Sequence, residues 1–255
     1  MKKTSEEIDR IAAAGDILAR CHKLLKAKAR AGVTTAQLDE AAEKFIRSQA
    51  AEPAFKGYRG FPGSICASPN SMVVHGIPGT YKLTRGDILS LDIGVVYEGW
   101  VADAAVTLPI GSVTPIAARL LKVTREALFH AVDACLVGNR LGDVSFAVQN
   151  HVEAHGFSVI RSLVGHGIGR DMHEDPQIPN FGKPGTGPEL EEGMVFAVEP
   201  MVNAGTHPIR MAADNWSVYS QDGSLAAHFE HTVAITAEGP RILTPWHLEE
   251  ARRAA

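Results

Sequence analysis

The sequence is poor in cysteine and in long apolar runs, and each of these gaps excludes a class of protein. Only three of its 255 residues are cysteine (Cys21, Cys66 and Cys135), and no Cys-x-x-Cys pair occurs. Such sparse usage excludes a disulfide-stapled secreted scaffold and is typical of a reducing cytoplasm. No apolar run approaches the ~20 residues of a membrane-spanning helix, and the start, MKKTSEEIDR, lacks the apolar core of a signal peptide. We therefore expect a cytoplasmic protein with no membrane partner.

A strong charge of one sign and several common catalytic motifs are also missing. The formal net charge is -4, which argues against a dedicated DNA-binding or RNA-binding protein. The chain contains no G-x-S-x-G nucleophile elbow, no H-E-x-x-H zinc helix and no Walker A loop. Its 45% hydrophobic and 21% charged residues are ordinary for a globular protein. Any catalytic site must therefore combine residues that lie far apart in the sequence.

Two helix starts are signalled near the N-terminus. Thr4 with Glu7, and Thr34 with Gln37, form capping-box patterns. Apolar residues recur at helical spacing after both, which predicts two consecutive helices. The segments ILSLDIGVV and WVADAAVTL then predict a β-hairpin, with Tyr97-Glu98-Gly99 between its strands.

The same order returns in the second part of the chain. Helical patterning at about 115–137 is followed by a helix that we expect to start at Asp143 and to end near Gly156. The segments FSVIRSLVG, MVFAVEPMV and WSVYSQDGSLAAHFEHTVAIT predict strands.

This repeated order predicts an α+β protein of two similar halves. The halves span about 5–110 and 115–236, and no segment between them has the composition of a flexible linker. We expect a single domain over residues 1–255, with its functional site between the halves.

Four carboxylates stand in strongly apolar, β-branched surroundings. They are Asp92 in SLDIGVV, Asp103 in VADAAVT, Glu199 in MVFAVEP and Glu230 in HFEHTVAIT. A buried charge is costly unless a partner compensates it, and basic residues near these strands are few. Two divalent cations would remove the repulsion among the carboxylates, so the pattern predicts a two-metal hydrolase.

The spacing within the predicted strands supports this reading. Asp92 and Asp103 lie either opposite or diagonal across the hairpin, and in both cases on one face. Strand alternation would place Glu230 on one face with His228 and Thr232. His166 lies between glycines in GHGIG, which expose its ring. Oxygen donors with one imidazole suit Mn, Fe(II), Co or Zn, and two such ions about 3.5–4 Å apart would hold a bridging hydroxide and polarise a carbonyl.

Five segments, taken together, resemble type I methionine aminopeptidase of the pita-bread fold. They are VVHGIP, LSLDIGVVYEGWVADAAVT, GHGIGRDMHEDPQIPNFG, MVFAVEPM and FEHTVAIT. The resemblance covers nearly the whole chain, with the motifs in the family's order. It implies two pseudo-symmetric helix-helix-hairpin halves around a central curved antiparallel sheet.

The resemblance also implies residue roles. The metal ligands would be Asp92, Asp103, His166, Glu199 and Glu230, with Asp103 and Glu230 bridging two ions. Glu199 would also shuttle a proton, while His173 and His75 would contact the scissile carbonyl and the substrate's amino end. A pocket for methionine would be lined by Tyr58, Phe61, Cys66, Met172 and Trp216. Phe55, Gly94 and Met172 depart from residues that are frequent in the family.

The function so implied is that of a methionyl aminopeptidase, a hydrolase that removes the initiator methionine from nascent polypeptides before a small second residue. Two alternatives share the fold: an Xaa-Pro-type aminopeptidase, and a non-catalytic ribosome-binding protein. We expect a monomer whose partners are nascent N-termini. A transient ribosome contact could involve a basic cluster on the first helix, although such clusters are usually solvated: Arg20, Lys23, Lys26, Lys28 and Arg30.

Overall fold

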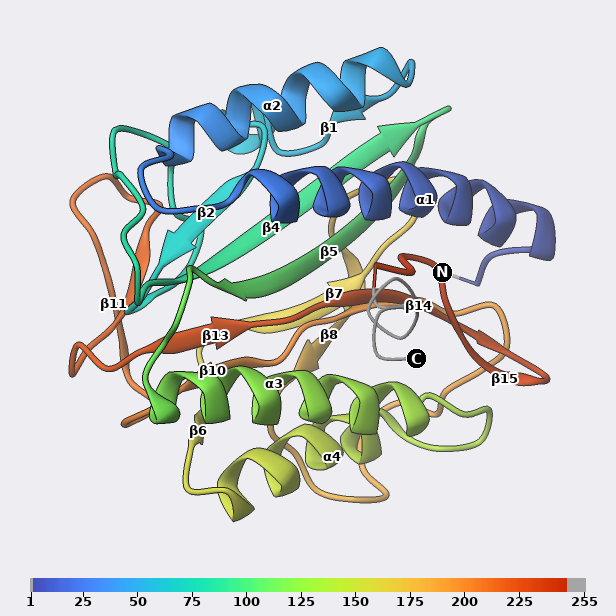
Figure 1. Ribbon diagram of the computed structural model, residues 1–255. Coiled ribbons are helices and arrows are strands. Elements are labelled where there is room, and N and C mark those ends of the chain that lie inside the picture. Colours follow the sequence, from blue (N-terminus) through green and yellow to red (C-terminus); the bar gives the residue numbers. More distant parts are fainter. Residues whose placement is uncertain (1, 247–255) are drawn as a thin grey trace, which may run out of the picture.

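The computed structural model describes residues 2–246 and contains helices and strands in the predicted order (Figure 1). The helices are α1 (Ser5–Lys28), α2 (Thr35–Ser48), α3 (Pro115–Asp133) and α4 (Leu141–Ala154), with a 3-10 turn η1 (Tyr58–Gly60). The strands of the first half are β1 (Glu52–Pro53), β2 (Cys66–Pro69), β3 (Met72–Val74), β4 (Ile88–Tyr97) and β5 (Trp100–Pro109). The later strands are β6 (Ser158–Val159), β7 (Val164–Gly167), β8 (Glu174–Pro179), β9 (Val195–Val198), β10 (Met201–Asn203), β11 (Ile209–Met211), β12 (Val218–Ser220), β13 (Ala226–His228), β14 (His231–Thr236) and β15 (Gly239–Ile242).

Side-chain caps fix the helix starts. In α1 the Glu7 N–H donates to Thr4 Oγ1 and the Thr4 N–H to the Glu7 carboxylate, and Thr34 with Gln37 repeats this arrangement in α2. Both predicted capping boxes are confirmed. The prediction for α4 was wrong by two residues, because Asp143 is the third helical residue. Its carboxylate accepts from the Arg140 N–H at 2.7 Å, and the helix begins at Leu141.

The first half packs α1 and α2 against the predicted hairpin. Strands β4 and β5 pair antiparallel, and α1 runs across them in Figure 1. The contact is apolar, with Leu18 and Leu25 of α1 fully buried. Gly15 allows a close approach on α1, because a Cβ there would lie 1.9 Å from the Leu243 carbonyl oxygen. The segment after β15 is thereby held against α1.

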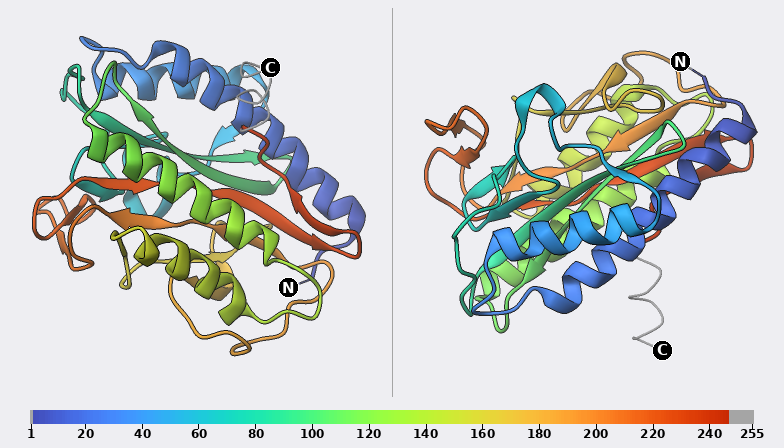
Figure 2. Two further views of the ribbon diagram at one scale, coloured as in Figure 1. Left: turned by 60° about the horizontal axis from the view of Figure 1, so that its bottom comes forward. Right: turned by 90° about the horizontal axis from the view of Figure 1, so that it is seen from above.

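The second half contains a longer and interrupted hairpin. Strand β9 pairs with β14, and β10 pairs with β13, so that one continuous register spans two short breaks. Helix α3 lies over these strands, with α4 outside it (Figures 1 and 2). The prediction of one strand for FSVIRSLVG was wrong, since β6 and β7 are separate and join different sheets. Strand β6 pairs with β10, whereas β7 pairs with β8 and β9.

The two halves meet where β5 runs beside β13 and β14. Thr232 Oγ1 accepts from the Asp103 N–H at 3.0 Å and donates to the Asp103 carbonyl at 2.8 Å. The Thr107 hydroxyl makes the same pair of bonds with the His228 backbone. These four hydrogen bonds join strands whose sequences lie more than 100 residues apart. No helix within residues 2–246 is long and apolar enough to cross a membrane.

Candidate metal centre

The first hairpin places Asp92 and Asp103 diagonally on one face. Gly94 is paired with Asp103, and Asp92 with Ala105. Of the two arrangements that the spacing allows, the structure has the diagonal one. Both side chains are largely buried, at 9% and 5% exposure. Because Asp103 is also fixed by Thr232, its backbone is tied to the second half of the molecule.

The second hairpin places Glu199 and Glu230 face to face in its paired breaks. On one side of the gap Val198 pairs with His231, and on the other Met201 pairs with His228. The register between them sets Glu199 opposite Glu230. The expectation that Glu230 lies within a strand was wrong, because β13 ends at His228 and β14 begins at His231. Its backbone is nevertheless held: the Glu230 N–H donates to the Ala105 carbonyl at 2.9 Å, and its own carbonyl accepts from Trp246 Nε1 at 3.0 Å.

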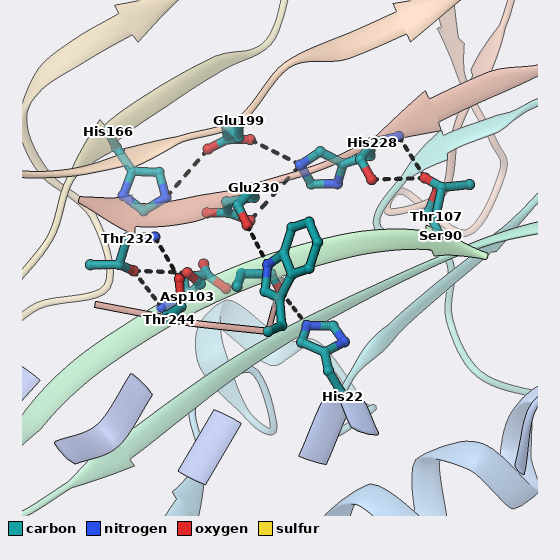
Figure 3. Close-up of polar contacts among 12 residues, drawn as sticks. His22, Ser90, Asp103, Thr107, His166, Glu199, His228, Glu230, Thr232 and Thr244 are labelled. Atoms are coloured by element: carbon teal, nitrogen blue, oxygen red, sulfur yellow. Dashed lines mark hydrogen bonds and ion pairs between the residues drawn. The ribbon is translucent and has the colours of Figure 1, made fainter. Parts of the chain in front are cut away.

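His166 reaches the same space from β7. Its Nδ1 lies 2.9 Å from the Gly167 carbonyl, which can only accept a hydrogen bond. The proton therefore resides on Nδ1, and Nε2 keeps its lone pair for a ligand. Nε2 lies 3.6 Å from Glu199 Oε1 (Figure 3). The glycines on both sides are required by close packing, since a Cβ at Gly165 would lie 2.4 Å from the Ala197 carbonyl oxygen.

These residues fit a divalent cation. Asp103, His166 and Glu230 each offer one ligand atom, and the three atoms lie within 4.8 Å of one another. One carboxylate oxygen of each of Asp92, Asp103 and Glu230 is buried without a hydrogen-bond partner. Such orphaned oxygens are costly unless a cation or a proton satisfies them.

The electrostatics of the four carboxyls point the same way. Burial raises the pKa of Asp92 to about 7. Burial, and then the neighbouring carboxylates, raise the pKa values of Asp103, Glu199 and Glu230 well above their ordinary values. The protein alone therefore favours protonated carboxyls here. Divalent cations would favour the ionised forms instead.

Two further histidines lie at the mouth of this cluster. The ring of His173 packs against that of His166 with centroids 4.3 Å apart, and its Nδ1 lies 2.8 Å from the Tyr58 hydroxyl. His75 follows β3 with a left-handed backbone at φ 58°. Burial, followed by the positive charge of His173, lowers the pKa of His75. The structure thus brings both predicted histidines to the carboxylate cluster.

Several side chains predicted to line an apolar pocket are buried or pack against one another. Phe61 packs edge-on against Trp216 with ring centroids 5.1 Å apart, and Phe61 and Met172 are buried. Cys66, at the start of β2, is paired with Asp92 in the register. Burial raises the pKa of its thiol well above the ordinary value, so Cys66 acts as a small neutral wall residue.

The three departures from the family pattern meet at one point. A Cβ on Gly94 would lie 2.7 Å from Met172 Cε and 2.8 Å from Phe55 Cε1. Phe55 and Met172 therefore fill the volume that a side chain at position 94 would occupy. This relationship joins positions that are far apart in the sequence, and no sequence signal reveals it.

Sequence reasoning missed a buried histidine at the centre of the site. His228 lies between Glu199 and Glu230, with Nε2 at 3.7 Å and 3.9 Å from their nearer oxygens (Figure 3). Both of its ring nitrogens are buried without a hydrogen-bond partner. Strand alternation already placed His228 on one face with Glu230, but it did not reveal that the ring also reaches Glu199.

Comparisons with known proteins agree with this geometry. Residues 9–237 match the description of metallopeptidase family M24. The methionine aminopeptidase of Clostridium perfringens (strain 13 / Type A) is 50% identical over 242 residues, covering 95% of this chain and 97% of that protein. The crystal structure of methionine aminopeptidase from Rickettsia prowazekii superposes with a TM-score of 0.95 at 40% identity, covering 96% of this chain and 99% of that one.

A more distant likeness concerns the fold alone. The Xaa-Pro dipeptidase from Bacillus anthracis superposes with a TM-score of 0.77 at 22% identity, and the match covers 96% of this chain but only 62% of that one. The predicted pita-bread architecture is confirmed by these superpositions. With a family match over most of its length and a relative of 50% identity, the chain belongs to metallopeptidase family M24.

Proposed function

We propose that this protein removes the N-terminal methionine from polypeptides whose second residue is small. One observation carries the proposal: buried carboxylates converge with His166, and the apolar side chains of Phe61 and Met172 are also buried, with Trp216 packed against Phe61. A pocket of apolar, aromatic and thioether groups suits an unbranched thioether side chain. The names of the most similar relatives support the same activity.

We further propose that the cluster holds two divalent metal ions. The ligands would be Asp92, Asp103, His166, Glu199 and Glu230. The ions would be Mn, Fe(II), Co or Zn, which accept both oxygen and imidazole donors. When bound, such ions would activate water and polarise the scissile carbonyl. The orphaned oxygens of Asp92, Asp103 and Glu230 support this ligand set.

The chain's own residues would bind, orient and move protons. Glu199 is suited to carry a proton to the leaving amine, because burial and neighbouring carboxylates raise its pKa. The exposed ring of His173 stands beside His166 and can donate to the acyl oxygen. His75, whose pKa is lowered by burial and then by the charge of His173, would contact the amino end of the peptide.

We propose that the chain works as one catalytic domain over residues 1–255 and as a cytoplasmic monomer. The ends of that range, residue 1 and residues 247–255, lie outside the described residues. The hydrogen bonds between Thr232 and Asp103 support a single unit, since they cross between the halves. Free thiols at Cys21, Cys66 and Cys135 fit a reducing compartment. The natural partners would be the N-termini of nascent chains.

A contact with ribosomal RNA stays a prediction. The five basic side chains of the predicted cluster are exposed on and just after α1: Arg20, Lys23, Lys26, Lys28 and Arg30. Reversing their charge should weaken co-sedimentation with ribosomes while leaving hydrolysis of short peptides intact. Unchanged co-sedimentation would contradict a ribosome contact through this surface.

Peptide selectivity tests the main proposal. Metal-loaded protein is incubated with Met-Gly-Met-Met and with Pro-Gly-Met-Met, and chelated protein serves as the control. We expect release of methionine from the first peptide only, and none after chelation. Equal cleavage of both peptides, or cleavage of the proline peptide alone, would overturn the assignment.

The two alternatives have less support. The likeness to the Xaa-Pro dipeptidase is at 22% identity, against 50% for a methionine aminopeptidase, so it supports the shared fold and not that activity. A non-catalytic role is disfavoured because the buried carboxylates and histidine converge, an arrangement that is costly to keep without a cation.

A further inference from the structure

Helices α3 and α4 carry a second group of metal-ligating side chains, on elements that supply none of the five proposed catalytic ligands. Glu126 and His130 lie four residues apart on α3, and His151 on α4 lies four residues before His155, which caps the C-terminal end of α4. Residues with this spacing share a helix face. The two faces meet, since the His130 and His151 rings have centroids 4.6 Å apart. We call these four residues the α3–α4 histidine cluster.

The members of the cluster already contact one another. The His151 and His155 rings have centroids 4.5 Å apart, and His151 Nε2 lies 3.4 Å from Glu126 Oε2. The other oxygen of Glu126 is 3.9 Å from the Lys122 ammonium, so Oε2 is directed to the histidines. One carboxylate and three imidazoles are therefore grouped on a solvent-accessible helix pair.

The hydrogen bonds of His151 and His155 leave the Nε2 atom of each ring available to bind a metal ion. His155 Nδ1 lies 2.8 Å from the His151 carbonyl, which can only accept, so Nδ1 carries the proton and Nε2 keeps its lone pair. A backbone carbonyl that fixes the tautomer in this way is typical of metal-ligating histidines. His151 Nε2 is buried and has no hydrogen-bond partner.

The charge state also favours a ligand. Burial, followed by the charges of His130 and His155, lowers the pKa of His151. The ring is therefore neutral near pH 7, as a metal ligand must be. Protonating several of these imidazoles together would oppose their close packing, whereas one cation would satisfy all of them.

We propose that the α3–α4 histidine cluster is a second metal site, which binds a divalent transition cation such as Zn²⁺ and links α3 to α4. Three imidazoles with one carboxylate form a donor set that zinc accepts in tetrahedral geometry. Within residues 2–246, ligand atoms converge only at Asp103, His166 and Glu230, so binding at the α3–α4 histidine cluster requires its side chains to turn toward a shared ion. His130 and His155 are exposed, so their rings are free to turn toward a shared ion.

The test counts zinc equivalents on the full chain. Zn²⁺ is titrated calorimetrically into the protein and into a His130→Gln/His155→Gln variant, and bound zinc is measured after dialysis. His207→Gln serves as the matched control, because His207 is exposed on a different part of the surface. The two cluster substitutions are at exposed positions, so the variant keeps its fold, which its unfolding midpoint in chelator verifies.

We expect the cluster variant to bind one zinc equivalent fewer than the parent and the control, with unchanged release of methionine. Its thermal midpoint should also rise less on addition of zinc. Equal zinc binding in all three proteins, or the same loss in the His207 control, would overturn the proposal. Because the measurement counts zinc rather than activity, its outcome does not depend on whether the proposed peptidase function is correct.

Discussion

The Tyr58 hydroxyl lies 2.8 Å from His173 Nδ1, and the two rings stack with centroids 5.4 Å apart. When the phenol donates to Nδ1, the ring proton is on Nε2, the nitrogen that remains to bind an acyl oxygen. Tyr58 therefore orients the His173 ring, and its hydroxyl can accommodate this tautomer by donating to Nδ1. Burial, followed by the positive charge of Arg59, lowers the pKa of His173, so the ring is neutral as this arrangement requires.

Replacing Tyr58 by Phe should lower kcat/KM for Met-Gly-Met-Met about 3- to 10-fold. A hydrogen bond of this kind contributes roughly 0.5–1.5 kcal/mol, and the stacked ring is retained. Tyr219→Phe is the matched control, since Tyr219 packs on Arg210 instead. Unchanged kcat/KM in Tyr58→Phe across the neutral pH range would show that Tyr58 has no part in orienting His173.

Asp103→Asn and Glu230→Gln should each abolish most peptide hydrolysis and most metal binding. Both side chains belong to the convergent group with His166, and an amide supplies a weaker, uncharged ligand. We expect the metal-free variants to be at least as resistant to urea as the metal-free parent, because a repelling buried carboxyl has been removed. Near-normal turnover with full metal occupancy would contradict the ligand assignment.

The metal-free protein should lose stability as pH rises from about 4, where the carboxyls of the unfolded chain ionise, through neutrality. The pKa of Asp92 is about 7 in the folded protein, and those of Asp103, Glu199 and Glu230 are higher than normal. The folded state therefore keeps protons that the unfolded chain has already released, and folding becomes less favourable as they are removed.

Buried histidines act in the opposite direction at lower pH. His22 and His228 have pKa values lowered by burial to about 4 and about 3, so their stabilising contribution is lost only as pH falls below 6.5. Urea unfolding in chelator should thus show a falling free energy above neutrality. The slope should be smaller in Asp103→Asn. An identical slope of the unfolding free energy against pH in the parent and in Asp103→Asn would show that the buried carboxyls do not cause the loss of stability.

A threonine at position 94 should destabilise the protein by about 1–3 kcal/mol, as overpacking does. Its Cβ would collide with Met172 and Phe55. Phe55→Cys should recover part of this loss, so that the double variant is more stable than the sum of the single effects predicts. Thermal unfolding of all four proteins in the cycle measures the coupling, and additive effects would show that the two positions do not share one volume.

His228→Leu should weaken metal binding about 10- to 100-fold, whereas His228→Gln, which retains a donor, should weaken it less. The unfolding free energy of the metal-free protein should change little or rise, because His228 has two buried nitrogens without partners. Metal titration and urea unfolding separate the two effects. Equal metal affinity in the Leu and Gln variants would assign His228 to packing alone.

Local signals in the sequence predicted much of this fold. The capping boxes at Thr4 and Thr34 are satisfied by neighbours three residues away, so they can be recognised without the rest of the protein. The carboxylates could be identified because a charge within a β-branched run is costly to bury unless a partner compensates it. Strand β9 ends at Val198, shortly before Pro200, which lacks an N–H for the ladder.

What the sequence left open depended on register. Asp92 and Asp103 are diagonal because Glu98 and Gly99 alone form the turn, both with left-handed backbones at φ 48° and 76°. The spacing of the two aspartates does not determine which residues turn. The placement of Phe55 and Met172 around Gly94 likewise depends on distant segments meeting, which no local pattern encodes.

The carbonyl of Glu230 accepts from Trp246, and Thr244 Oγ1 accepts from the Thr232 N–H beside it. Residues that are synthesised late therefore hold the backbone of a proposed ligand in place. During translation, a growing chain that already contains Asp92, Asp103, His166, Glu199 and Glu230 would still lack these two anchors. The backbone around Glu230 would therefore reach its final position only after Thr244 and Trp246 have been added to the chain.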